Sequence, residues 1–172
     1  MVREWQRLTR ISIWSSLLLV ILIAAPLVAP TTSQPSQTQL EQRRIRMLES
    51  ALAPQTAEEA VLTWARGVKT RNGALQFAVF SPELRSKREA DYVAANWVTG
   101  ASSPWVESYK IIRQEQDAEG WEFEVEYQLA SSVGSEGTSI DRIRVEQLPL
   151  TEDHPEGWYI TQLDSAPTNL IF

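Results

Sequence analysis

The pattern of hydrophobic and polar positions divides the chain into three parts. Residues 11–29 are uncharged and mostly apolar. From residue 40 to about residue 95, apolar residues recur every three or four positions, which is typical of amphipathic helices. From residue 105 to residue 163 they alternate with polar residues, which is typical of half-buried strands. The pattern therefore predicts an apolar N-terminal segment followed by an α+β domain, with its helices before its sheet.

The apolar segment at residues 11–29 predicts a transmembrane helix. Nineteen helical residues rise about 28 Å, which is close to the ~30 Å hydrocarbon thickness of a bilayer. Three arginines lie within residues 1–10, whereas the first basic residue after the segment is Arg43. Because positive flanks stay in the cytoplasm, we expect a basic cytoplasmic tail, a single pass through the cell membrane, and a C-terminal domain outside. A cleaved signal peptide is the alternative, although its apolar region is usually shorter.

Local signals place a tether and four helices after the anchor. Residues 30–53 begin with an uncharged Pro/Ser/Thr/Gln-rich tether and end in a stalk helix. Thr56 and Glu59 have capping-box spacing and start the second helix, and Ser81-Pro82 starts the last. The predicted helices cover residues 40–52, 56–71, 74–80 and 82–95. We expect residues 54–172 to form one extracytoplasmic domain.

The alternating region predicts a four-stranded antiparallel meander, over residues 106–116, 121–129, 140–148 and 158–163. In the second strand, aromatic and aliphatic residues alternate with glutamates, so we expect the glutamates to face solvent. We place the next turn at Gly134–Gly137. That turn pairs Val125 with Val145 on the inner face and Glu126 with Arg144 on the outer face.

Composition excludes several classes of function. The chain carries 16 basic and 22 acidic side chains, and 13 and 21 of these lie beyond residue 10. The net charge of −8 outside the membrane repels phosphate backbones, so we expect no nucleic-acid partner. The chain has no cysteine, which excludes thiolate catalysis and cysteine-ligated metals. No phosphate loop, nucleophile elbow or metal-binding helix motif is present, and we expect neither a cofactor nor a metal.

The order of elements, the helix carrying Trp64 and the aromatic alternation of residues 121–127 resemble the NTF2-like, or cystatin-like, cone fold. The resemblance covers about residues 54–165. The segment WARGVKTRNGALQFAVFSPEL, residues 64–84, also resembles small bacterial membrane-anchored domains without an assigned activity. The resemblance implies helices packed on a curved four-stranded antiparallel sheet. It implies no single function, since the fold hosts isomerases, dehydratases, transport factors and binding modules. The additional first strand of that fold is predicted near Trp97–Thr99, or is missing.

Two groups of residues are candidates for a site. Enzymes of the cone fold use an acid, a histidine or a tyrosine between helices and sheet, and the resemblance therefore implies Asp91, Tyr92 and Tyr109 as candidates. A desolvated Asp91 would act as a base, although a surface acid above a packed Tyr92 is the alternative. The second group is a loop holding Trp97 and Trp105 within Gly, Ser and Pro residues.

Exposed tryptophans are rigid apolar anchors for a protein, peptide or glycan. The alternative is that both rings close the open end of the cone. Arg71 is expected to line the same region, or only to cap its helix. The leading interpretation is a non-catalytic binding or sensing module of a bacterial cell envelope. A small NTF2-like isomerase or hydrolase acting on an apolar metabolite is the alternative, and a structural part that forms a homodimer through its sheet is a third possibility.

Overall fold

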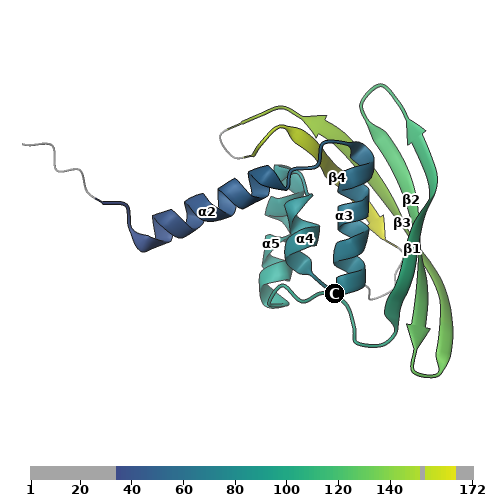
Figure 1. Ribbon diagram of the computed structural model, residues 1–172. Coiled ribbons are helices and arrows are strands. Elements are labelled where there is room, and N and C mark those ends of the chain that lie inside the picture. The colour runs from purple at the N-terminus through teal and green to yellow at the C-terminus, as the bar shows by residue number, and fades with distance from the viewer. Residues whose placement is uncertain (1–33, 152–153, 166–172) are drawn as a thin grey trace, which may run out of the picture. The chain divides into compact units, whose positions relative to one another are not determined.

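The structure, a computed structural model, describes residues 34–151 and 154–165 (Figure 1). Within these ranges, no helix is both long enough and apolar enough to cross a membrane. The cytoplasmic tail predicted at residues 1–10 and the anchor predicted at residues 11–29 lie outside the described residues. From Thr38 onward the chain forms one compact unit.

The described chain has an α+β fold, as the sequence predicts. Its helices are α2 (Gln37–Ala51), α3 (Ala57–Thr70), α4 (Gly73–Ala78) and α5 (Pro82–Ala94). Its strands are β1 (Trp105–Gln116), β2 (Trp121–Ser131), β3 (Gly134–Leu148) and β4 (Gly157–Ser165). The strands form one antiparallel sheet in the order β1-β2-β3-β4, which confirms the meander. Figure 1 shows α3 lying along one face of the twisted sheet, and α3 contacts all four strands.

The predicted helix starts are confirmed by their caps. The Thr56 hydroxyl accepts a hydrogen bond from the amide of Glu59, and Ser81 caps α5 with Pro82 at its first position. α3 ends one residue before the predicted bound: Arg71 is its C-cap in the left-handed conformation (φ 57°), and the Asn72 side chain caps α4.

The core lies between α3 and the inner face of the sheet, around the fully buried Trp64. Phe123, Val125 and Tyr127 of β2 are buried there, which confirms the predicted inner face. The glutamates of β2 lie on the outer face, where Glu124 and Glu126 pair with basic side chains of the neighbouring strands. Lys110 of β1, for example, lies 2.8 Å from a carboxylate oxygen of Glu126.

The predicted pairing of β2 with β3 is wrong by four residues. The turn occupies residues 132–133, and Val125 pairs with Asp141 instead of Val145. Gly134 and Gly137 both have positive φ, but both belong to β3: Gly134 pairs with Ser131 directly after the turn, and Gly137 lies at a bulge opposite the end of β2. Because the error is an even number of residues, every side chain keeps its predicted face.

Candidate functional site

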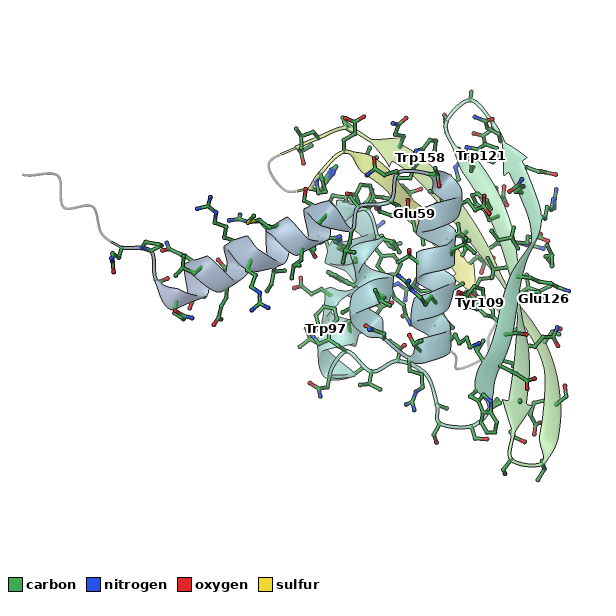
Figure 2. All side chains as sticks on the ribbon, viewed as in Figure 1. Glu59, Trp97, Tyr109, Trp121, Glu126 and Trp158 are labelled. Carbon is green, nitrogen blue, oxygen red and sulfur yellow. The ribbon has the colours of Figure 1, made fainter. Side chains whose placement is uncertain are left out.

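The tryptophan loop, residues 95–105 between α5 and the start of β1, brings the two predicted tryptophans to the surface. Trp97 is 37% exposed and Trp105 is 41% exposed, and Val98 beside Trp97 is also exposed. One side of the Trp97 ring packs inward, with centroids 5.2 Å from Phe77 and 5.8 Å from Tyr92. Trp97 therefore covers an aromatic cluster of the helices and is still accessible, and its role toward a partner stays a prediction. Figure 2 labels it beside α4 and α5, away from the sheet.

The backbone of the tryptophan loop is held in a strained conformation. Asn96 and Trp97 have φ values of 51° and 60°, which residues other than glycine rarely adopt. The amide of Trp97 donates to the carbonyl of Tyr92, and its carbonyl accepts from the amide of Gly73, both at 2.9 Å. An added Cβ at Gly73 would lie 2.9 Å from that carbonyl oxygen, so glycine is needed there. In place of the additional strand predicted near Trp97–Thr99, Val98 makes an isolated bridge to Asn72.

Arg71 fixes the same loop from the end of α3. Its Nε donates to the carbonyl of Thr99 at 2.9 Å, and its Nη2 donates to the carbonyl of Gly100 at 2.8 Å. Arg71 thus contacts the tryptophan loop through the backbone carbonyls of Thr99 and Gly100. Its role toward a ligand stays a prediction.

A buried polar chain supports the loop from inside. Gln76 donates to the hydroxyl of Thr99 at 2.7 Å, and Tyr92 donates to the side-chain oxygen of Gln76 at 2.8 Å. Burial raises the pKa of Tyr92 far above its ordinary value. Tyr92 is therefore an interior residue of the scaffold. Its neighbour Asp91 is exposed on α5, 4.0 Å from Arg88, so the expected desolvation of this carboxyl does not occur.

Tyr109 is separate from the tryptophan loop. It lines an open groove of about 360 Å³ between α3 and β1, together with Thr56, Glu58, Glu59, Leu62, Thr63 and Arg66. Figure 2 shows Tyr109 on the side of β1 that faces α3. The candidates predicted for an enzyme are therefore not gathered at one place: Asp91 is on α5, Tyr92 is interior, and Tyr109 is at the sheet.

Asp141 of β3 is a buried acid that the sequence analysis did not single out. It is 2% exposed, and the indole Nε1 of Trp64 donates to its Oδ2 at 3.1 Å. Burial raises the pKa of the Asp141 carboxyl. The nearby Tyr127 hydroxyl is buried without a hydrogen bond of ordinary geometry, and burial together with Asp141 raises its pKa. Asp141, Ile143 and Val145 occupy every second position of β3, which assigns all three side chains to the inner face. This spacing was the feature of the sequence that could have identified Asp141 as a buried acid.

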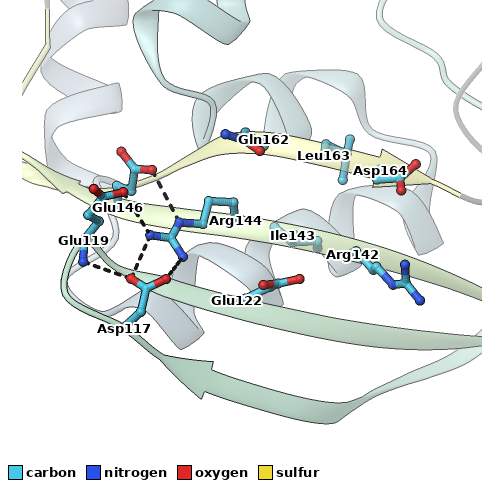
Figure 3. A pocket seen from close by; sticks show the side chains of 10 residues that line it. All are labelled: Asp117, Glu119, Glu122, Arg142, Ile143, Arg144, Glu146, Gln162, Leu163 and Asp164. Carbon is cyan, nitrogen blue, oxygen red and sulfur yellow. Dashed lines mark hydrogen bonds and ion pairs between the residues drawn. The ribbon is translucent and has the colours of Figure 1, made fainter.

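The outer face of the sheet holds a larger polar groove of about 550 Å³ (Figure 3). Its charges satisfy one another: Arg144 bonds to both carboxylate oxygens of Asp117 and lies 3.4 Å from Glu146. The Arg144 guanidinium lowers the pKa of the Asp117 carboxyl. Among the described residues, no cluster of three or more His, Asp or Glu side chains is arranged to hold a metal ion.

Comparison with known proteins leaves the chain without an assigned family. No protein-family model matches it. No curated protein and no solved structure matches it significantly either. The similarity to the NTF2-like superfamily therefore stays a prediction from element order and motif, and any function has to be argued from this chain's own residues.

Proposed function

We propose that this protein is a membrane-anchored, extracytoplasmic binding or sensing module, and that it binds a protein of the bacterial envelope through the tryptophan loop. The α+β domain would be an NTF2-like cone used as a scaffold, without catalysis. The order of helices and the antiparallel meander support this architecture. The apolar, uncharged residues 11–29 and the arginines before them support the anchor and its orientation.

One observation carries the proposal: side-chain hydrogen bonds from the domain hold the tryptophan loop in place, while its apolar side chains remain accessible. Arg71 and the buried Gln76 hold Thr99, and two non-glycine residues are kept in left-handed conformations. Strained backbone of this kind persists only where the surrounding structure determines it, and it is common at binding sites. A loop that is already ordered loses less conformational entropy on binding. Tryptophan is also among the residues that contribute most at protein interfaces.

Site-specific photocrosslinking in the native membrane tests the proposal. A photoreactive residue at Val98 is expected to give one discrete adduct with an envelope protein. The matched control is a photoreactive residue at Val133, which is also a valine and is even more exposed than Val98 (90% against 53%), but lies at the β2–β3 turn. With the purified partner, Trp97→Ala is expected to weaken binding by at least tenfold, as for an interface hot spot. Equal labelling from both positions would contradict a specific surface at the loop.

A small NTF2-like isomerase or hydrolase is the second candidate, and Asp141 is the observation that favours it. A buried carboxyl with a raised pKa beside an unpaired tyrosine hydroxyl is a typical setting for acid–base chemistry. Titration with the apolar fluorophore anilinonaphthalene sulfonate tests whether the interior admits a ligand. A one-to-one complex that Asp141→Asn weakens, with Asp91→Asn as the control, would favour the enzyme over the binding module.

A further inference from the structure

Helix α2 exposes an unusual number of large apolar side chains. Four large apolar side chains of α2 and that of the residue after it are between 46% and 66% exposed: Leu40, Ile45, Met47, Leu48 and Leu52. No residue of α2 is buried. A fifteen-residue helix gains little stability from its own hydrogen bonds, and helices of this length usually depend on a packed apolar face. Something outside the described residues is therefore expected to cover α2.

The apolar residues of α2 share one side of the helix. At 100° per residue, these five and Ala51 fall within an arc of about 160°, which also contains Arg44, Gln37 and Glu41. Glu49 lies outside the arc, and its carboxylate contacts Arg85 of α5 at 3.4 Å. This contact between α2 and the rest of the domain thus uses a different side of the helix, and the five apolar side chains remain 46–66% exposed.

The charge of α2 differs from that of the domain that follows. Arg43, Arg44 and Arg46 lie within one turn, and with two glutamates they give α2 a net charge of +1. Residues 54–172 carry 10 basic and 19 acidic side chains, a net charge of −9. An anionic surface would therefore attract α2 and repel the domain. Arg43 lies just beyond one end of the apolar arc and Arg44 lies within it, and basic side chains beside an apolar face are typical of helices that lie in a membrane interface.

We infer that α2 lies on the anionic lipid surface of the membrane that anchors the chain, with its apolar side among the lipid headgroups. The inference rests on the proposed function, because it requires the anchor at residues 11–29. Only residues 30–36 separate that anchor from α2, and seven extended residues span at most about 25 Å. Arg44 falls on the apolar arc, where a long basic side chain reaches headgroup phosphates while its stem stays apolar. Lipid contact would hold the domain close to the membrane and restrict the orientation of the tryptophan loop.

A single fluorescent label reports this contact, because the chain has no cysteine of its own. The full chain with Met47→Cys carries an environment-sensitive fluorophore and is reconstituted in two kinds of vesicle. One contains phosphatidylcholine alone, and the other also contains phosphatidylglycerol. We expect the emission to shift to shorter wavelength, and brominated lipid to quench it, when phosphatidylglycerol is present. Ser50→Cys, on the polar side of α2, is the matched control and is expected to show neither effect.

Charge reversal tests the electrostatic part. Arg43→Glu with Arg44→Glu is expected to abolish the shift, since each basic residue near an anionic surface changes the bound population roughly fivefold. Flotation of the vesicles reports the anchor separately. If the protein floats but the Met47 label stays in water, the inference is overturned and the anchorage stands. If the protein does not float, both fail. Efficient disulfide formation by Leu48→Cys, without any response to phosphatidylglycerol, would overturn the inference in favour of a second copy covering α2.

Discussion

The hydrogen bond from Trp64 to Asp141 leads to a quantitative prediction, because it joins two side chains that are both almost fully buried. Trp64→Phe keeps an aromatic ring in the core and removes only the indole donor and part of the ring. A hydrogen bond to a charged group contributes about 1.5–3 kcal/mol to stability. The lost apolar atoms add about 1–2 kcal/mol. We therefore expect Trp64→Phe to lower the free energy of unfolding by about 2.5–5 kcal/mol at neutral pH.

A double-mutant cycle separates these two contributions. Asp141→Leu removes the carboxyl, so that Trp64→Phe in this background should cost only the packing term of about 1–2 kcal/mol. The difference between the two costs is the coupling energy, expected at about 1.5–3 kcal/mol. Urea denaturation of the chain in a mild detergent, followed by circular dichroism, measures all four proteins. A coupling energy below about 0.5 kcal/mol would refute the reasoning, because independent sites are additive within that margin.

The same acid predicts a pH dependence. Burial raises the pKa of Asp141 from its ordinary value of 3.8, so the folded state binds this proton more tightly than the unfolded state. The contribution of Asp141 to stability is therefore greatest when the carboxyl is protonated, and it declines as the pH rises from about 3.8 through the raised pKa. As the pH rises through that range, the wild type should therefore lose stability relative to the Asp141→Leu variant. A constant difference between the two proteins would show that Asp141 does not titrate anomalously.

Three further predictions follow from packing and charge. Val125→Ala should lower the free energy of unfolding by about 2 kcal/mol or more, because Val125 is fully buried in the core, and urea denaturation measures this. Gly67→Ala should destabilise by about 1–3 kcal/mol in the same assay despite alanine's better helix propensity, since the new Cβ would lie 2.7 Å from Cγ and 3.0 Å from the backbone amide of Gln76. Asp117→Asn should be less stable than the wild type at neutral pH. That difference should close as the pH falls below about 3.8, because Arg144 lowers the pKa of Asp117 in the folded state.

Each of these has its own control. Val133→Ala, at an exposed turn, should change the free energy of unfolding by less than about 0.5 kcal/mol. If Val125→Ala had an equally small effect, the strand faces would be inverted. A gain in stability for Gly67→Ala would show that Gln76 moves freely. Glu119→Gln is the control for Asp117, because it neutralises an acid 3.8 Å from Arg144 in the same groove. If both variants had the same pH profile, the bidentate pair would not be the cause.

The sequence by itself determined the elements and their faces. Helix starts are encoded locally, since the Thr56 and Ser81 hydroxyls bond to amides three residues away. The inner face of β2 is encoded by an alternation of period two, which survives any error of an even number of residues. That is why Val125 was correctly placed in the core although its partner was not.

Tertiary structure alone decided the register and the candidate sites. Local turn propensity favoured Gly134–Gly137 as the turn, but pairing across the sheet places both glycines in β3, with Gly137 at a bulge. The bond from Trp64 to Asp141 joins residues 77 positions apart, and no short-range pattern encodes such a contact. The exposure of Asp91 likewise depends on which side of α5 the core covers. A sequence encodes periodicity and caps through neighbouring residues, whereas burial, pKa and the shape of a surface arise from distant segments that meet only in the folded chain.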